Sequence, residues 1–243
     1  MNALEYKTKE CVVGFIDILG SSKAIETDAE GSLNVIHKAY EDALSMFQKL
    51  FGDFYLQPSV KIFSDNIVVS VEYKDNKFKR SAFFAVAMMS AIVQVEFLKR
   101  SWLTRGGISS GSFFLDNVMV WGSALVKSYQ LESMVAIYPR VVIDPKLIGE
   151  LKLALPQTDT HCKTWIRQDK DGLFFIEFIN DCLRNAELFA LGLFQLIEDQ
   201  IAENHNNPKV CQKWIWLSSY VKERLFNTEK VDGAKDDNTN EDT

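Results

Sequence analysis

Two aspartates, Asp17 and Asp65, lie within apolar stretches of the sequence, in the segments FIDILG and KIFSDNIV. An ionised carboxylate in such surroundings is costly unless a charge or a metal ion compensates it. If the strand that carries Asp17 lies beside the segment that carries Asp65, the two carboxylates meet at one edge of a sheet and repel each other. A divalent cation relieves that repulsion. Oxygen ligands with open positions favour Mg²⁺ or Mn²⁺, the ions that accompany nucleotide phosphates.

A simpler interpretation exists for each aspartate alone. Asp-Asn is common in turns, so Asp65 could do no more than form a turn with Asn66. Asp17 could cap the loop that begins at Gly20. Buried acids are rare, however, and two of them in similar surroundings favour the metal site.

The sequence around the two aspartates predicts the elements that would position them. An apolar run over residues 11–20 ends in Gly20 and predicts a buried strand followed by a tight loop. Residues 60–73 predict two strands joined by a tight turn at residues 64–66. Between these strands, apolar residues at three- and four-residue spacing over 33–50 predict an amphipathic helix.

The pattern of strands and helices continues toward the C-terminus. A helix is predicted over residues 80–102; its apolar run of about 14 residues is too short to span a bilayer and indicates a buried helix. The segment RGGISSGSFFLD predicts a strand, another helix begins near Gly122, and YPRVVID predicts a last strand. This alternation predicts an α/β (α+β) class, a ferredoxin-like sandwich with its helices on one face of the sheet.

The chain divides into three predicted parts. Residues 8–145 hold the sheet and its helices. Residues 146–227 predict an extension made of a hairpin, with its turn at residues 169–172, and two helices. Residues 228–243 have little apolar content and predict a disordered acidic tail.

The composition limits the partners and the compartment. The chain has 33 acidic and 27 basic residues, a net charge of −6, and 47% hydrophobic residues, which is the balance of a soluble globular protein. Its acidity argues against a nucleic-acid partner. The N-terminal segment is too polar for a signal peptide, and the four cysteines lack the spacing of a zinc site. We therefore expect a cytoplasmic protein that binds neither nucleic acid nor a membrane.

Five segments occur in an order that resembles the class III nucleotidyl cyclase family: FIDILG, KIFSD, RGGISSG, WGSALVKSYQLE and YPRVVID. Within that family the sequence is most similar to the bacterial pyrimidine cyclases of the Pycsar anti-phage defence systems. The resemblance covers residues 8–145 and implies the cyclase fold, with conversion of UTP or CTP to the 3′,5′-cyclic monophosphate (cUMP or cCMP) and diphosphate. It also implies a head-to-tail homodimer with composite active sites, and a product that acts on a separate effector protein in antiviral defence.

The resemblance also implies roles for individual residues. Asp17 and Asp65 would bind two ions, Mn²⁺ or Mg²⁺, with the backbone carbonyl of Ile18 as a further ligand. The loop that follows the first strand would surround the triphosphate with backbone N–H groups. The residues assigned to this loop are Phe15, Gly20, Ser21 and Ser22. Taken without the resemblance, its last three residues are more typical of an ordinary strand-to-helix turn.

The sequence departs from the purine cyclases at the positions that stabilise the transition state. Adenylyl cyclases carry an Asn and an Arg on the helix after the WG pair, where this chain has Val126 and Gln130. Arg105 or Lys127 could supply the missing positive charge. Arg105 could equally do no more than cap a strand.

The base-contacting positions argue against ATP as the substrate. The ATP enzymes have an Asp where this chain has Met119, and a methionine cannot accept a hydrogen bond from an exocyclic amine. Lys61 occupies the second position, four residues before Asp65. Lysine is a donor only, so it could contact uracil O4 but not the cytosine amino group. This favours a uridylate cyclase slightly over a cytidylate cyclase, although an exposed lysine at a strand end is an equally good explanation.

Two other functions remain open. The absence of the usual Asn and Arg is compatible with a catalytically silent cyclase-fold dimer that senses a nucleotide. A metal-dependent relative of polymerases or phosphodiesterases would share the aspartate pair, and for the polymerases the acidic charge of the chain is unfavourable.

Overall fold

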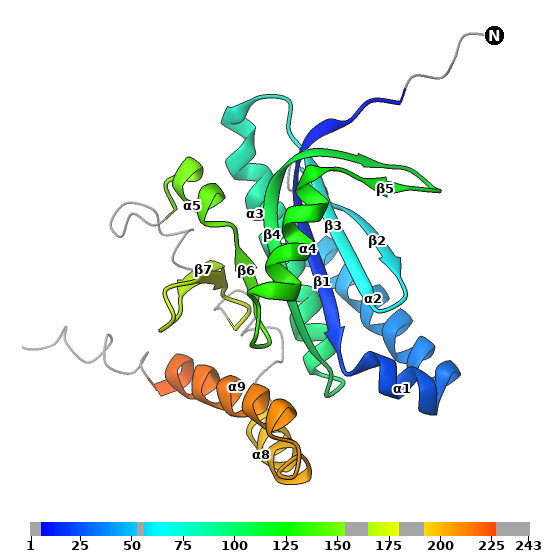
Figure 1. The fold of residues 1–243 in the computed structure, drawn as a ribbon, viewed down its shortest axis with the longest axis vertical. Coiled ribbons are helices and arrows are strands. Elements are labelled where there is room, and N and C mark those ends of the chain that lie inside the picture. Colours follow the sequence, from blue (N-terminus) through cyan, green and yellow to red (C-terminus); the bar gives the residue numbers. More distant parts are fainter. Residues whose placement is uncertain (1–5, 53–55, 154–164, 180–191, 227–243) are drawn as a thin grey trace, which may run out of the picture. The chain divides into compact units, whose positions relative to one another are not determined.

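The computed structural model describes four ranges of the chain, 6–52, 56–153, 165–179 and 192–226 (Figure 1). The chain divides into two compact units, residues 1–188 and residues 189–243. The tail predicted over residues 228–243 lies outside the described residues. The boundary predicted between residues 145 and 146 stays a prediction.

The first unit combines strands and helices, so the predicted mixed α/β class is confirmed. Its strands are β1 (Lys9–Leu19), β2 (Ser59–Phe63), β3 (Asn66–Glu72), β4 (Leu103–Leu115), β5 (Val120–Trp121), β6 (Val141–Ile143), β7 (Ile166–Gln168) and β8 (Phe174–Ile176). Its helices are α1 (Ser21–Thr27), α2 (Ala29–Phe51), α3 (Asn76–Leu98), α4 (Ser123–Met134) and α5 (Pro145–Leu151). The second unit contains α8 (Leu193–Glu203) and α9 (Pro208–Phe226).

Strand β1 lies inside the sheet, whose order is β2-β3-β1-β4-β6-β8-β7, with β5 paired to β4. Both neighbours of β1, which are β3 and β4, run antiparallel to it. The hairpin expected around Asp65 is confirmed: Phe63 pairs with Asn66, which leaves Ser64 and Asp65 as a two-residue loop. Ser64 adopts a positive φ of 56° in that loop.

Helices cover both faces of the sheet, so the expectation of helices on one face was wrong. Helix α3 packs on β1, β3 and β4, and α2 packs on α3, whereas α4 packs on β1 and β4 from the other side (Figure 1). A Cβ placed at Gly14 would lie 3.2 Å from Val86 of α3, and one at Gly107 would lie 2.4 Å from Leu131 of α4. These glycines occupy adjacent rows of β1 and β4, and adjacent positions along a strand face opposite sides.

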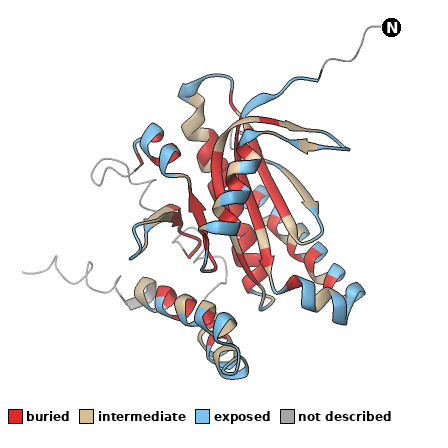
Figure 2. Ribbon diagram, viewed as in Figure 1, coloured by how far each residue is buried: buried red, intermediate tan, exposed pale blue. Residues whose placement is uncertain are grey.

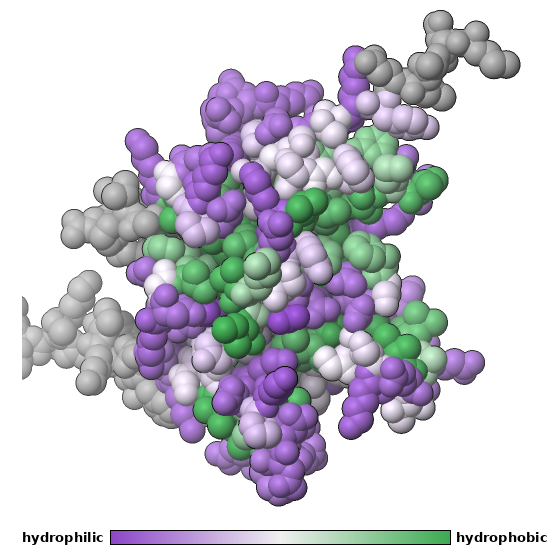
Figure 3. All heavy atoms as spheres, viewed as in Figure 1, coloured by the Kyte–Doolittle hydropathy of each residue, from purple (hydrophilic) through white to green (hydrophobic). Residues whose placement is uncertain are grey.

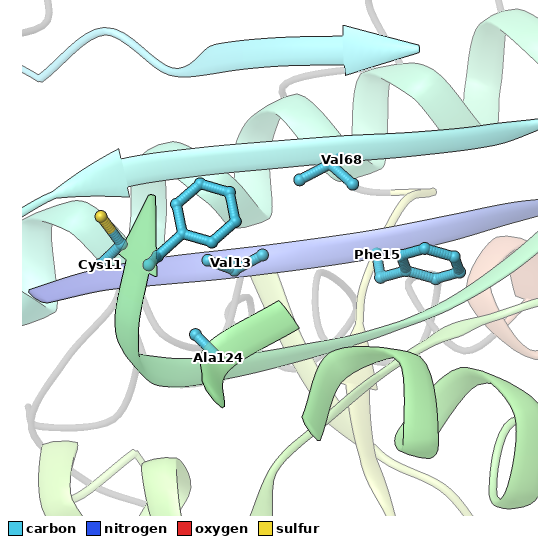
Figure 4. Packing of buried hydrophobic residues seen from close by; sticks show 6 residues of the cluster. Cys11, Val13, Phe15, Val68 and Ala124 are labelled. Atoms are coloured by element: carbon cyan, nitrogen blue, oxygen red, sulfur yellow. The ribbon is translucent and has the colours of Figure 1, made fainter. Parts of the chain in front are cut away.

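The apolar sequence of β1 explains why both faces need cover. Six consecutive residues, from Cys11 to Ile16, are buried, which is typical of a strand enclosed on both sides. On the α4 side, Cys11, Val13 and Phe15 form a cluster with Val68 and Ala124 (Figure 4). Burial raises the pKa of the Cys11 thiol to about 12, so this cysteine behaves as a small apolar side chain.

Helix α3 begins earlier than predicted and is 23 residues long. Its polar first turn follows Asp75, whose side chain accepts a hydrogen bond from the Lys77 N–H over 3.2 Å. By length and composition alone α3 could cross a membrane, with a mean hydropathy of 1.8 over an 18-residue window, but 89% of that window is buried in the fold (Figure 2). The argument from a short apolar run was therefore wrong, whereas the predicted buried helix is confirmed.

The predicted hairpin beyond residue 145 is confirmed as β7 and β8, and it extends the sheet through the pairing of Val142 with Phe175. Arg140 joins the hairpin to the rest of the unit. Its guanidinium is buried and forms ion pairs with Asp169 and Asp171 in the hairpin turn. It also lies 5.7 Å from the ring of Phe175, so charge and packing act together here.

Candidate active site

Strand pairing brings Asp17 and Asp65 together, as the sequence predicted. Asp17 pairs with Asn66, the residue that follows Asp65. The N–H of Ile18 donates a hydrogen bond to the carbonyl oxygen of Asp65 over 3.1 Å. The Asp17 side chain is 21% exposed, so this carboxylate is partly buried and still accessible to a ligand.

Two neighbouring groups hold the Asp65 carboxylate. The Ser21 hydroxyl donates to one oxygen over 2.5 Å, and the Asn66 side-chain amide donates to the other over 3.1 Å. Ser21 is buried at the start of α1, directly after Gly20, which adopts a left-handed φ of 80° and turns the chain out of β1. The structure therefore places Ser21 against Asp65, while Ser22 is exposed on the first turn of α1.

Arg105 lies opposite Asp17 in the pairing of β1 with β4. Its Nε donates to Asp17 Oδ2 over 3.4 Å, and its Nη1 donates to the carbonyl oxygen of Ala136 over 3.5 Å. Its Nη2 lies 2.7 Å from Oε1 of Glu132. Arg105 is thus part of the site. Lys127, the other candidate cation, lies on α4 and acts on Glu150 of α5: a hydrogen bond from Lys79 chiefly lowers the pKa of Glu150, and the charge of Lys127 adds a smaller effect.

Glu132 is a member of this cluster that the sequence reasoning missed. It is 3% exposed, and burial raises the pKa of its carboxyl group, as do the charges of Asp17 and Asp65, while Arg105 acts in the opposite direction. A signal for it was present, because the buried residues of α4 are Ala124, Ser128 and Glu132, four residues apart. That spacing places a glutamate on the helical face that packs on the sheet.

Helix α4 reaches the cluster because it lies very close to β4. A Cβ at Gly107 would lie 2.4 Å from the carbonyl oxygen of Ser128, so this approach requires a glycine. The Ser128 hydroxyl is within hydrogen-bond distance of the Val13 carbonyl (2.8 Å) and of Ser109 Oγ (3.1 Å). The segment RGGISSG thus supplies both the cation of the site and the surface on which α4 rests.

The remaining predicted residues lie in two other places. Phe15 is buried, with its ring 5.5 Å from that of Tyr129 and 6.3 Å from that of Phe63. Lys61 on β2 donates to the carbonyl oxygen of Asn117 over 3.3 Å, in the loop between β4 and β5 that also holds the half-exposed Met119. The two base-contacting candidates thus lie on hairpins that touch each other.

The donor set determines which metal ion the residues could hold. Among the described residues there is no group of three or more His, Cys, Asp or Glu side chains that could hold a metal ion. Asp17 and Asp65 are therefore a pair of carboxylates with few protein ligands beside them. Mg²⁺ is commonly bound in this way, through one or two carboxylates, with water and substrate phosphates as the other ligands. The residues present fit such an ion.

Comparisons with known proteins give structural similarities at low sequence identity. No family model and no curated protein match the chain. The adenylyl cyclase CyaB from P. aeruginosa is 18% identical with a TM-score of 0.46, over 71% of this chain and 96% of that one. The monomeric guanylyl cyclase domain of the RhoGC fusion protein from the fungus Blastocladiella emersonii is 11% identical, with the same TM-score and coverage. The guanylate cyclase domain of RhGC from Catenaria anguillulae, in complex with GTP, is 13% identical with a TM-score of 0.44, over 71% of this chain and 98% of that one.

Proposed function

We propose that this protein is a nucleotidyl cyclase that converts a pyrimidine nucleoside triphosphate, UTP or CTP, to the 3′,5′-cyclic monophosphate and diphosphate. The observation that carries the proposal is the cluster of Asp17, Asp65 and Arg105 at one end of three neighbouring strands. These residues fall in the first three of the five segments that resemble the class III cyclases.

In the proposed reaction the ribose 3′-oxygen forms a bond to the α-phosphorus, the bond from that phosphorus to the leaving diphosphate breaks, and the hydroxyl proton passes to solvent. Two divalent ions, Mn²⁺ or Mg²⁺, would lower the pKa of the 3′-hydroxyl and neutralise the negative charge of the leaving diphosphate. Asp17 and Asp65 would hold them, with the Ile18 carbonyl as a further ligand. Ser21 and Asn66 orient the Asp65 carboxylate through their hydrogen bonds.

Arg105 is the residue we assign to stabilise negative charge on the phosphates, in place of the Asn and Arg of the adenylyl cyclases. Its guanidinium lies beside Asp17 and its side chain is one quarter exposed, so a triphosphate bound at Asp17 would come within its reach. Charge-assisted hydrogen bonds from a guanidinium to phosphate oxygens are strong and directional. The positions of the missing Asn and Arg, Val126 and Gln130, are exposed on α4.

Lys61 and Met119 are the residues we assign to the pyrimidine base. Met119 has no acceptor for the amino group of adenine. Lys61 can donate to uracil O4 or to the O2 that both pyrimidines share, which favours UTP slightly. Gly20 and Ser22 complete the proposed nucleotide-binding residues, through the backbone of the loop around the triphosphate. The expectation that Phe15 belongs to this loop was wrong, because Phe15 is buried within β1 and paired with β3 and β4.

A second copy of the chain completes the site in this proposal. The face formed by α4, the residues just after it and the β4–β5 hairpin exposes several large apolar side chains (Figure 3), and exposed apolar patches commonly mark interaction surfaces. These residues are Val118, Met119, Trp121, Val126, Tyr129, Met134 and Ile137. A head-to-tail homodimer would cover them and bring the base-contacting hairpins of one copy to the aspartates of the other. On the resemblance alone, the product acts on a separate effector in the cytoplasm, in defence against phage.

The decisive experiment incubates the purified protein with Mn²⁺ and each of the four nucleoside triphosphates. We expect cUMP, or cCMP, and diphosphate in equal amounts, and no product after Asp17→Ala. Formation of cAMP alone, or of no cyclic nucleotide, contradicts the proposal.

The second candidate function is a silent nucleotide-sensing dimer. The engagement of Arg105 by two acids, together with Val126 and Gln130 at the positions of the usual Asn and Arg, favours it. It predicts tight nucleotide binding by calorimetry without release of diphosphate.

A further inference from the structure

Arg105 is shared between two acids at unequal distances. Its Nη2 lies 2.7 Å from Glu132 Oε1, whereas its Nε lies 3.4 Å from Asp17 Oδ2. The guanidinium therefore lies closer to the glutamate on α4 than to the aspartate on β1. The contact with Glu132 is an ion pair without hydrogen-bond geometry, whereas the contact with Asp17 is a hydrogen bond. A single cation cannot fully neutralise two carboxylates, so the two acids compete for it.

Glu132 is built into the fold in a way that fixes its position. Its side chain is 4% exposed, and a buried charge is stable only beside an opposite one. The preceding turn of α4 is anchored on the sheet through the Ser128 hydroxyl and the Val13 carbonyl. Because Gly107 allows the backbone of α4 to rest directly on β4, the glutamate cannot retreat from Arg105.

This arrangement bears on the function proposed above, because the Arg105 guanidinium and a divalent metal ion would both bind the Asp17 carboxylate. A guanidinium paired fully with Asp17 would exclude a divalent cation by occupying its ligand and by repulsion. We infer that Glu132 is a positioning residue: it draws the Arg105 guanidinium toward itself, so that Arg105 competes less with a divalent cation for the Asp17 carboxylate. The inference rests on the proposed metal site, and it can be tested without measuring catalysis.

The test measures Mn²⁺ binding directly, from the electron paramagnetic resonance signal of the free ion in titrations of the full chain. Glu132→Gln keeps the size of the side chain and removes its charge, so that Arg105 pairs with Asp17 alone. We expect Mn²⁺ affinity to fall about tenfold, as for other residues that orient metal ligands. Glu132→Asp, which keeps the charge, should restore part of the affinity.

A double-mutant cycle shows whether Glu132 acts through Arg105. In an Arg105→Ala background the Arg105 guanidinium no longer competes for Asp17, so adding Glu132→Gln should leave Mn²⁺ affinity unchanged. The matched control is Glu96→Gln. Glu96 is also on a helix, is 4% exposed and pairs with an arginine, Arg100, at 3.1 Å. This variant should bind Mn²⁺ like the unmodified protein, and thermal unfolding monitors the folding of every variant.

Three outcomes would overturn the inference. An equal loss of affinity with and without Arg105 would mean that Glu132 attracts the ion directly. Unchanged affinity in Glu132→Gln would leave the glutamate a structural role only, and the absence of Mn²⁺ binding in the unmodified protein removes the metal site itself. If the binding results are as expected and no cyclic nucleotide forms, the proposed function fails and the role of Glu132 stands.

Discussion

Asp17 on β1 and Arg105 on β4 lie directly opposite each other in the sheet, and the guanidinium Nε donates to the carboxylate over 3.4 Å. Their side chains meet because the backbone ladder sets the pairing. A slip of one residue between β1 and β4 would turn Arg105 to the other face of the sheet. The contact is thus as well defined as the register of the strands.

The first prediction concerns the aspartate pair. Asp17→Asn and Asp65→Asn keep the shape of each side chain and remove its charge, so neither holds a divalent ion well. Because such an ion supplies several kcal/mol of charge stabilisation, cyclic product formation should fall at least about a thousandfold. The measurement is the initial rate of diphosphate release.

Asp75→Asn is the matched control for this pair, since Asp75 caps α3 through the Lys77 N–H and has no part in the proposed site. It should retain normal turnover. Near-normal turnover in Asp17→Asn would remove the proposed metal site.

The second prediction concerns the choice of base. Lys61→Met removes a charged donor and should lower kcat/KM for UTP by about tenfold to a hundredfold, the value of a hydrogen bond to a charged group. The loss for CTP should be smaller, because an amino group replaces the acceptor at that position of the base. Steady-state kinetics with both substrates measures the ratio of the two kcat/KM values.

The control is Lys49→Met, which replaces an exposed lysine on α2 and should change neither kcat/KM value. Equal losses for UTP and CTP in Lys61→Met would show that Lys61 does not distinguish the two bases.

The third prediction concerns dimer formation through α4. Val126 is 54% exposed on α4, and Val126→Asp would place a charge in the proposed dimer interface. We expect the dimer to dissociate at least about thirtyfold more readily, measured by sedimentation velocity. Leu33→Asp introduces the same charge at an apolar residue of α2 that is 63% exposed, and it should leave the dimer intact. A dimer that tolerates Val126→Asp uses another surface.

The fourth prediction concerns stability and its dependence on pH. Arg140→Met keeps much of the buried volume but leaves Asp169 and Asp171 without their cation. Both acids retain contact with solvent, so the free energy of unfolding should fall by about 2 kcal/mol, less than for a fully enclosed pair. Urea denaturation at neutral pH measures this loss.

The effect of Arg140→Met should diminish in acid. Burial alone would raise the pKa of Asp171, but hydrogen bonds from Arg140 and from the Leu173 N–H outweigh it and hold the pKa below its ordinary value of 3.8. A lowered folded-state pKa contributes stability above the unfolded-state value, and that contribution is lost as the pH falls through the folded-state pKa. The difference between the two proteins should therefore be full at about pH 6 and smaller below about pH 3. A constant difference would show that the arginine acts by packing alone.

Much of the site could be predicted because its signals are local. The apolar run that contains Asp17 and the turn residues around Asp65 indicate a strand and a hairpin from a few neighbouring residues each. The faces of the sheet could not be assigned, because α4 turns the small or polar residues Ala124, Ser128 and Glu132 inward. Such a helix has no clear apolar stripe.

The ion pair between Glu132 and Arg105 could not be predicted from the sequence, for a different reason. It depends on which strand lies beside β1 and on how closely α4 crosses it, and neither is specified by residues near in sequence. The start of helix α3 was missed as well. Its first turn, directly after Asp75, is polar, and the sequence predicted only the apolar part of the helix.

The members of the cluster come from β1, the β2–β3 loop, β4 and α4, so the chain must bring together residues 88 apart to form the pair of Asp17 and Arg105. Contacts between such distant segments form late, because the intervening chain must first lose its freedom. No partly folded intermediate that lacks β4 can contain the complete cluster. At the proposed metal site, Mn²⁺ binding followed during refolding would therefore report the assembly of β1, β3 and β4, and a fragment that ends before α4 would lack Glu132.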